Sequence, residues 1–572
     1  MTLAARVMRP KFRVARPRNS VAVPPIAWVL RPALLLALAA AWMFGGCAAM
    51  PDERRATFGF DFRTPETDRK PTAIIFMVDG VNADVFRTML DGGRLPNIRK
   101  YLVDRGLYVE RCAANVPGVT MVNQTSLVTG LFAGRHGIVG NTWFDRNRLI
   151  HRNYEEVAEK NLLDADYVVT TLFEQFRDAT TMSLFYQAHR GATRFIENWL
   201  SAGPPYFMGW YGLVDRISLW RFDLVAQMAR EQGQFPALVF AYLLSPDMEA
   251  YDNGVSSDSY AAALEHSDAH IGRIIRDLEK AGRLDRTVLV LVSDHGMIDV
   301  DRHWPIRRFF RDELHLAVSG ERRWEQTAFE SRMAYYRNFT CVLAGSGDRY
   351  WAVYLRKPRA GGGAGATEFE NWLARPSPED LRAYPGASHG PIDIIERLTA
   401  AEAVDLVAYR TGPGSVRLVT RGGSAEASRA AEGGRRYALR ILHGEDPLGY
   451  AETVPAAMLD GSPHGDREWL AATAESPYPD LVPQIVTYFD APWAGDIIVF
   501  AAPTWDFTDH YKAGHGGLRP GEMFTVFAAA GPGVPHERTR GPIRSVDVMP
   551  TVLELLGRPI PPGLDGRSIL GK

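Results

Sequence analysis

The sequence predicts an α/β protein with a mostly parallel central sheet flanked by helices. Three apolar runs, at Thr72–Val78, 235–244 and Thr287–Val292, show no regular alternation with polar residues. Such runs are typical of strands buried on both faces of a parallel sheet. Helical periodicity lies between them, most clearly at 257–280, where the apolar residues fall on one face. Two further runs, at 496–502 and Phe524–Ala530, are predicted to return the chain to the same core.

Carboxylates and an imidazole follow the three runs at the point where each predicted strand ends. Asp79 follows the first run, Asp247 the second, and Asp294 with His295 the third. Ligand sites in open α/β sheets lie beyond the carboxyl ends of the strands, so these residues predict a metal site. The alternative for each aspartate is a turn or a helix cap without a ligand.

Thr120 precedes a short predicted helix at 122–129. Backbone N–H groups and the helix dipole favour an anion at such a position, which would suit a nucleophilic threonine. The alternative is that Thr120 only caps the helix.

His266 and His270 lie one turn apart on the helix predicted at 257–280 and are interpreted as ordinary helix residues. The following aromatic residues are interpreted as core, with a substrate cleft as the alternative: Trp199, Tyr206, Trp210, Tyr211 and Trp220.

Composition limits the function without defining it. The chain has 572 residues, more than one ordinary domain, and can bury a large core. Its net charge of −2 gives no signal for nucleic-acid binding. Three cysteines exclude a disulfide scaffold, and the sequence leaves open whether Cys112 and Cys341 pair.

The first fifty residues are predicted to be a targeting segment. A basic region is followed by an apolar stretch at 33–44, which suits a signal-peptide core and is short for a membrane span. Phe44-Gly45-Gly46-Cys47 resembles a bacterial lipoprotein cleavage box, although Phe44 stands where leucine is preferred. We expect lipidation at Cys47, membrane attachment through that lipid, and a folded part on the periplasmic side of the cell envelope. An uncleaved anchor or a plain signal is the alternative.

The remaining chain is predicted to divide into four parts. Residues 51–70 form a tether, 71–300 the first part of the catalytic core, 301–489 a smaller α+β insertion or cap, and 490–572 the second part of the core. Strands are expected within the insertion at 404–409 and 415–420.

Motifs in a fixed order resemble the type I phosphodiesterase / nucleotide pyrophosphatase family of the alkaline phosphatase superfamily. Thr120 stands ten residues before Gly130, the interval that the family keeps between its nucleophile and a Leu-Val-Thr-Gly element. Gln124 and Val122 depart from the family at peripheral positions. The motifs that carry the resemblance are Val78-Asp79-Gly80, Thr120 with Asn123, Leu127-Val128-Thr129-Gly130, His136-Gly137, Pro246-Asp247, Ser293-Asp294-His295-Gly296-Met297 and His515-Gly516-Gly517.

The resemblance implies an alkaline-phosphatase-like fold and two divalent metal ions, for which Zn²⁺ is the best match. One ion would be held by Asp79, Asp294 and His295, with Thr120 bridging toward it. The other would be held by Asp247 and His515, and here the chain departs from the family. The third ligand is usually a histidine four residues after the aspartate, and that position is Tyr251. We therefore expect the second site to be weaker.

The predicted reaction is hydrolysis of a phosphodiester or pyrophosphate bond in a small phosphoester substrate. Thr120 would attack phosphorus to give a covalent phospho-threonine, and Asn123 would hold a non-bridging oxygen. A phosphonate or phosphomonoester hydrolase is the alternative among enzymes. A non-catalytic surface lipoprotein that keeps the fold is the alternative of another class.

Overall fold

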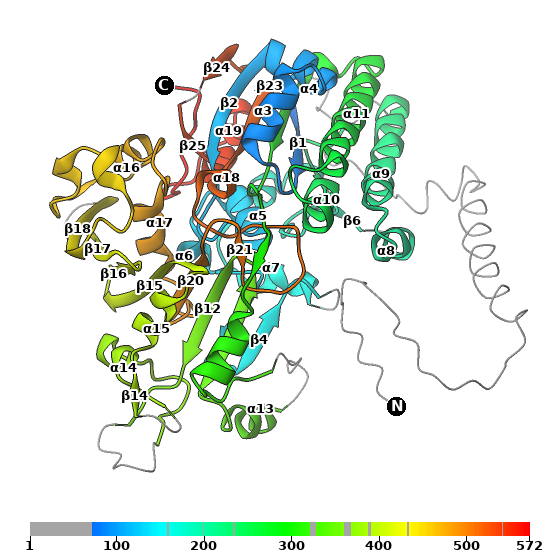
Figure 1. Ribbon diagram of the computed structural model, residues 1–572. Helices are drawn as coiled ribbons and strands as arrows, with labels where there is room; N and C mark the ends of the chain where they lie inside the picture. The colour runs from blue at the N-terminus through cyan, green and yellow to red at the C-terminus, as the bar shows by residue number, and fades with distance from the viewer. Residues whose placement is uncertain are drawn as a thin grey trace, which may run out of the picture. The chain divides into compact units, whose positions relative to one another are not determined.

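The computed structural model describes residues 71–571, apart from 157–158, 198, 233–234, 321–327, 360–367, 387–389, 432–433 and 540. These residues belong to one compact unit, Glu66–Lys572 (Figure 1). The predicted signal segment, Cys47 and the predicted tether at 51–70 lie outside the described residues. Within the described part, no helix combines the length and the apolar character that a membrane span requires.

The first of two large sheets confirms the predicted fold class. Its strands run in the order β24-β2-β23-β8-β1-β7-β5-β6, and β25 also pairs with β2. The strands from β8 to β6 are parallel to one another, and β23 is antiparallel to both of its neighbours. The bounds are β1 (Thr72–Val78), β2 (Gly106–Ala113), β5 (Thr181–Leu184), β6 (Arg194–Ile196), β7 (Leu238–Leu243), β8 (Thr287–Val292), β23 (Phe524–Ala530), β24 (Glu537–Thr539) and β25 (Ile543–Arg544).

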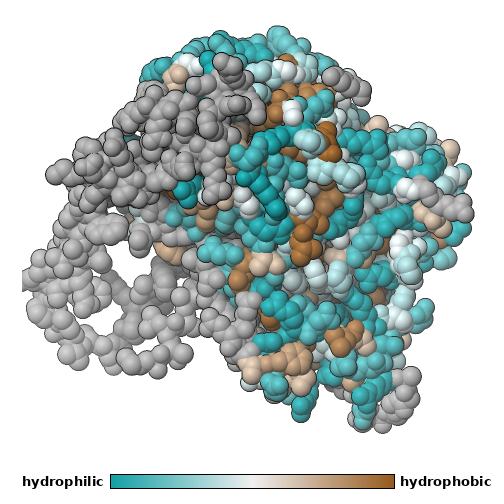
Figure 2. Space-filling model, turned by 180° about the vertical axis from the view of Figure 1, so that it is seen from behind, coloured by the Kyte–Doolittle hydropathy of each residue, from teal (hydrophilic) through white to brown (hydrophobic). Residues whose placement is uncertain are grey.

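Helices cover this sheet, which is why its central strands carry no polar face. All seven residues of β1 are buried. Ala73, Ile75 and Met77 lie in one core cluster with residues of α5 (Thr120–Thr129) and α19 (Val548–Leu555). A second group of helices stands together in Figure 1: α3 (Ala83–Asp91), α4 (Pro96–Tyr101), α9 (Tyr211–Gln232), α10 (Ser245–Asn253) and α11 (Asp258–Lys280). Seen from behind in Figure 2, the residues that the grey atoms leave in view are mostly hydrophilic, with scattered hydrophobic patches.

The second large sheet is antiparallel and has the order β11-β12-β20-β15-β16-β17-β18-β19. Its strands are β11 (Cys341–Ser346), β12 (Tyr350–Leu355), β15 (Val404–Gly412), β16 (Ser415–Val419), β17 (Gly423–Arg429), β18 (Arg436–Gly444), β19 (His464–Gly465) and β20 (Ile497–Ala501). β15 and β16 confirm the two strands predicted within the insertion.

One strand assignment was wrong. The run at 496–502 was predicted to return the chain to the central sheet, whereas β20 lies between β12 and β15 of the second sheet. β20 is fully buried, and a continuous apolar run looks the same in any sheet that is covered on both faces.

Two smaller predictions also have an outcome. Cys112 and Cys341 are both buried and free, so they do not pair with each other. Of the aromatic residues predicted to be core, Tyr211 is buried and Tyr206 packs partly buried beside it. Trp210 and Trp220 are 54% and 44% exposed, so the core interpretation was wrong for them. The side chain of Trp199 lies outside the described residues.

Candidate dinuclear metal centre

The predicted site residues come from separate elements, two of which are strands of the central sheet. Asp79 follows β1 directly, and Asp294 and His295 follow the neighbouring parallel strand β8. Asp247 lies in the first turn of α10, which begins two residues after β7. His515 follows β22 (Ala513–Gly514), a short strand that pairs with β9 (Ile298–Asp299) just beyond the Asp294-His295 turn.

Thr120 is the first residue of α5. The N-cap residue is Val119, which makes no side-chain capping bond. Thr120 is therefore not the cap of this helix. The Thr120 residue is 8% exposed. The Thr120 hydroxyl oxygen lies 3.2 Å from Nε2 of His295. This contact joins the predicted nucleophile to the predicted metal ligands.

The first ligand group consists of Asp79, Asp294 and His295. Nε2 of His295 lies 3.4 Å from Oδ1 of Asp79 and 3.4 Å from Oδ2 of Asp294. All three residues are buried, and their ligand atoms lie within 4.8 Å of one another. The predicted first metal site is therefore assembled in space.

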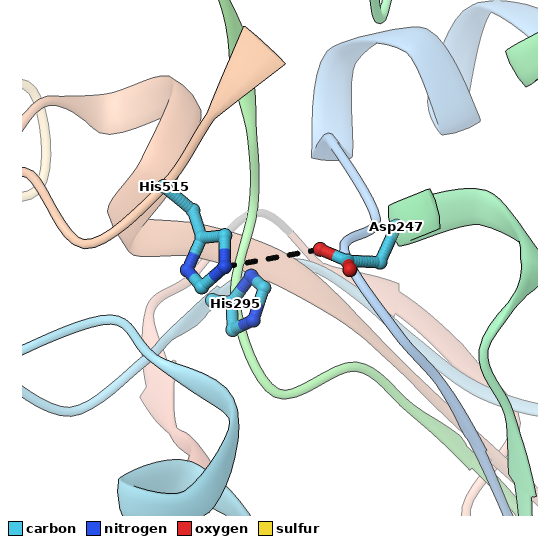
Figure 3. Close-up of side chains that lie close together, drawn as sticks. All are labelled: Asp247, His295 and His515. Atoms are coloured by element: carbon cyan, nitrogen blue, oxygen red, sulfur yellow. Dashed lines mark ion pairs between the residues drawn. The ribbon is translucent and has the colours of Figure 1, made fainter. Parts of the chain in front are cut away.

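The second ligand group consists of Asp247, His295 and His515, drawn in Figure 3. Nε2 of His515 lies 3.8 Å from Oδ1 of Asp247. The rings of His295 and His515 stack with centroids 3.6 Å apart and planes 9° from parallel. His295 thus lies within reach of both groups, whereas the sequence placed it in the first alone.

Two buried oxygen atoms test whether these residues fit a cation. Oδ1 of Asp79 and Oδ2 of Asp294 accept no hydrogen bond, although buried acceptors in native proteins are nearly always paired. Both atoms face Nε2 of His295. Carboxylate oxygens and imidazole nitrogens in groups of this kind suit Zn²⁺ and similar divalent ions. The residues present therefore fit the implied metal.

The electrostatics of the cluster lead to the same conclusion. Burial, followed by the nearby Asp294, holds the pKa of Asp79 well above its ordinary value. Burial raises the pKa of Asp294 to about 7, with Asp247 adding to the rise. Burial and then His515 lower the pKa of His295, which keeps its imidazole in the neutral form that binds metals. A divalent cation would offset the negative charge that this buried cluster carries when its carboxylates ionise.

Neighbouring groups fix the orientation of the ligands. The Tyr242 hydroxyl on β7 donates to Oδ2 of Asp79, which leaves Oδ1 directed at His295. Nδ1 of His515 lies 2.8 Å from the carbonyl oxygen of Gly118, so Nε2 is the ring nitrogen facing Asp247. Buried Asp215 of α9 accepts the backbone N–H groups of Leu244 and Ser245, which fixes the start of α10 beside Asp247.

Asn123 does not lie where the predicted contact with substrate requires. Its amide oxygen accepts the backbone N–H of Asn115 at 2.7 Å, and its amide nitrogen lies within 3.3 Å of the carbonyl oxygens of Asn115, Pro117 and Val119. The residue is fully buried. Both ends of the Asn123 amide contact the backbone at 115–119, the loop that leads into α5. The amide therefore holds this loop and is not directed at a substrate beside Thr120.

Asn141 was not singled out by the sequence. Its amide oxygen accepts the backbone N–H of Met121 at 2.9 Å, next to Thr120, and its amide nitrogen lies 3.2 Å from Oε1 of Glu155. It stands in a loop without periodicity between α6 (Ala133–His136) and β3 (Thr142–Asp145), so no sequence pattern marked it.

Tyr251 lies on α10 one turn after Asp247 and is buried. Its ring meets the ring of His515 edge to face, with centroids 5.7 Å apart and planes at 68°. A second tyrosine, Tyr511, also packs against Tyr251, with ring centroids 5.0 Å apart. The structure thus places Tyr251 beside the second group, and its role as a ligand stays a prediction.

Fold and site together define a class, an α/β protein in which a helix-terminal threonine faces a buried cluster of carboxylates and imidazoles. Residues 73–360 match the model of the type I phosphodiesterase / nucleotide pyrophosphatase family. Because that match covers half of the 572 residues, the chain belongs to this family.

Curated relatives share one segment with this chain. Ectonucleotide pyrophosphatase/phosphodiesterase family member 1 from Mus musculus is 27% identical over 234 residues, which cover 41% of this chain and 25% of the relative. Venom phosphodiesterase from Naja atra is 24% identical over 236 residues, covering 41% and 27%. The chain therefore spans about a quarter of the length of these relatives.

Solved structures support the fold. Murine ectonucleotide pyrophosphatase / phosphodiesterase 5 superposes with a TM-score of 0.52 at 16% identity, covering 86% of this chain and 96% of that chain. The human protein gives 0.53 at 15% identity, covering 86% and 97%. An inactive form of the murine protein was solved in complex with AMP. At these identities the likeness shows the fold alone.

Proposed function

We propose that this chain hydrolyses phosphodiester or pyrophosphate bonds with Thr120 as nucleophile and two divalent metal ions, best matched by Zn²⁺. The observation that carries the proposal is the 3.2 Å contact between the Thr120 hydroxyl and Nε2 of His295, which belongs to both ligand groups. Asp79, Asp294 and His295 would hold one ion, and Asp247 and His515, beside Tyr251, the other.

Each residue has a role that its position supports. Bound metal ions would supply positive charge that neutralises the phosphoryl group and lowers the pKa of the Thr120 hydroxyl. The N-terminal turn of α5 presents backbone N–H groups to the anionic substrate, and Asn141 fixes this turn through Met121. The amide nitrogen of Asn141 carries two N–H groups and has one described acceptor, Glu155, whereas that of Asn123 lies among three carbonyl oxygens. Asn141 is therefore the better candidate to donate to a phosphoryl oxygen.

The reaction would proceed in two displacements. The Thr120 hydroxyl loses its proton and its oxygen forms a bond to phosphorus, while the bond from phosphorus to the first alcohol or phosphate breaks and that group departs, taking up a proton. Water then attacks the phospho-threonine, which releases the second product and returns the hydroxyl to Thr120. Aryl mono- and diesters, nucleotides and phospholipid headgroup esters cover the substrates that this chemistry allows.

A substrate screen tests the proposal. The purified protein with added Zn²⁺ is expected to hydrolyse an aryl phosphodiester or a nucleotide pyrophosphate faster than the matched monoester. A chelator should abolish turnover, and Zn²⁺ should restore it. Preference for the monoester or for a phosphonate would favour the alternative hydrolases. A folded, metal-loaded protein that turns over none of these compounds would favour the non-catalytic surface lipoprotein.

We also propose that the chain is exported and anchored by a lipid on Cys47, on the basis of the signal-like segment at 33–44 and the box that ends at this cysteine. The full chain expressed in a Gram-negative host is expected in the membrane fraction and should incorporate labelled palmitate. Cys47→Ser should lose the label, and the matched control Cys112→Ser should keep it. Recovery of the native chain in the cytosolic fraction would contradict the proposal.

A further inference from the structure

Glu522 connects the two turns that carry the site histidines. It lies on α18 (Pro520–Met523) and is fully buried. Its backbone carbonyl accepts the N–H of Gly296, the residue after His295, at 2.9 Å. Its carboxylate accepts the N–H of Gly517, two residues after His515, at 2.7 Å. One residue thus holds both turns, through its main chain on one side and its side chain on the other.

The carboxylate of Glu522 is itself held by Arg349, which is also fully buried. Nε of Arg349 donates to Oε1 of Glu522 at 2.7 Å, and Nη2 lies 3.3 Å from Oε2. The same guanidinium donates to the carbonyl oxygens of Ala501, Ala502 and Trp505. Every direction of this planar group therefore meets an acceptor, so the carboxylate has little freedom to move.

Arg349 brings the second sheet to the site. It lies in the turn between β11 and β12, and in the same turn the Gly347 carbonyl accepts the backbone N–H of His515 at 2.9 Å. Position 517 has no space for a side chain beyond glycine while Glu522 keeps its place, because a Cβ atom there would lie 2.4 Å from Oε2 of Glu522. The antiparallel sheet is thus coupled to the position of His515 by two separate contacts.

We propose that Glu522 and Arg349 form a positioning pair that sets the spacing of His295 and His515 and thereby the affinity of the second metal site. The proposal rests on the proposed function. It explains why the two imidazole rings of Figure 3, which come from turns 220 residues apart in the sequence, stack within 3.6 Å. Neither Glu522 nor Arg349 contacts substrate in this proposal, because both act through the histidine turns.

Two variants separate positioning from simple stabilisation. Glu522→Gln keeps the shape of the side chain and removes its charge. Glu522→Asp keeps the charge beside Arg349 and withdraws the carboxylate from Gly517. We expect each to lower metal affinity, measured by chelator competition, about 10- to 100-fold, the range for residues that support metal ligands. The kcat on an aryl phosphodiester should fall with it, while KM changes little. Glu522→Asp keeps the test open if Glu522→Gln does not fold.

A matched control is Asp496→Asn. Asp496 is a buried carboxylate paired with buried Arg146, and it accepts the backbone N–H of Leu355 in the second sheet. The loss of the Asp496 charge should lower Tm, as the Glu522 variants do. Metal affinity and kcat, measured well below Tm, should stay unchanged. Glu522 variants that lower Tm and leave both metal affinity and kcat at the native values would overturn the positioning role.

The affinity measurement also separates this inference from the proposed function. A native chain that binds divalent ions but hydrolyses no ester would overturn the proposed function, and the affinity comparison would still decide the role of Glu522. A native chain that binds no divalent ion would overturn both.

Discussion

Thr120→Ala is expected to lower kcat/KM by at least about three orders of magnitude, because it removes the only atom proposed to attack phosphorus. The fold should tolerate the change. The described hydrogen bond of the Thr120 hydroxyl is the contact with His295, and the cap of α5 does not depend on it. The ligand groups built from Asp79, Asp294, Asp247 and the two histidines stay intact. Phosphodiesterase assays with metal analysis and circular dichroism on the same sample check the result.

Two further variants make the test specific. Thr120→Ser keeps the hydroxyl and loses a methyl group, so it should retain measurable turnover. Thr129→Ala removes a buried hydroxyl from the last turn of the same helix, where it donates to the Thr125 carbonyl at 2.7 Å. It should cost stability without the loss of activity. Native turnover in a folded Thr120→Ala protein would remove Thr120 from the mechanism.

The central sheet and the strand-end ligands could be predicted because both follow from local pattern. A strand buried on both faces must be apolar at every position, so β1 and β8 are visible as uninterrupted runs. Parallel neighbours end at the same edge of a sheet, which brings Asp79 and Asp294 together once their strands are recognised. His515 lies in a glycine-rich loop without such a pattern, and only the family resemblance indicated it.

The supporting residues could not be predicted, because their roles arise from contacts between distant parts of the chain. Glu522 and Arg349 are separated by 173 residues, and Tyr242 meets Asp79 across 163. Nothing near them in the sequence distinguishes them from other polar residues. Asn123 is the converse case, a residue that a motif marks but whose contacts the motif does not predict. It fits the family motif, yet the direction of its side chain depends on the backbone of Asn115–Val119, which a motif does not describe.

The second metal site should be the weaker one in the native chain, because Tyr251 stands beside Asp247 and His515 where the family usually has a histidine. A neutral imidazole binds Zn²⁺ near pH 7, whereas a phenol, whose ordinary pKa is about 10, must first lose a proton. Metal binding at this site therefore competes with protons, and occupancy should rise with pH. Activity of the native chain is expected to increase with added Zn²⁺ and with pH over the neutral to alkaline range.

Tyr251→His is expected to tighten the second site about 10- to 100-fold, the size of effect that single residues around a metal centre commonly have. The site has room for an imidazole, because the larger ring of Tyr251 already packs edge to face against His515 at 5.7 Å. The pH optimum of activity should move downward, since a neutral imidazole needs no deprotonation at neutral pH. Tyr511→His is the matched control, because it adds an imidazole to the same aromatic cluster from outside α10.

Metal analysis after exhaustive dialysis decides the outcome. One retained equivalent in the native chain and two in Tyr251→His are expected. Two retained equivalents in the native chain, with no gain in the variant, would show that Tyr251 is a full ligand or that another residue has taken its place.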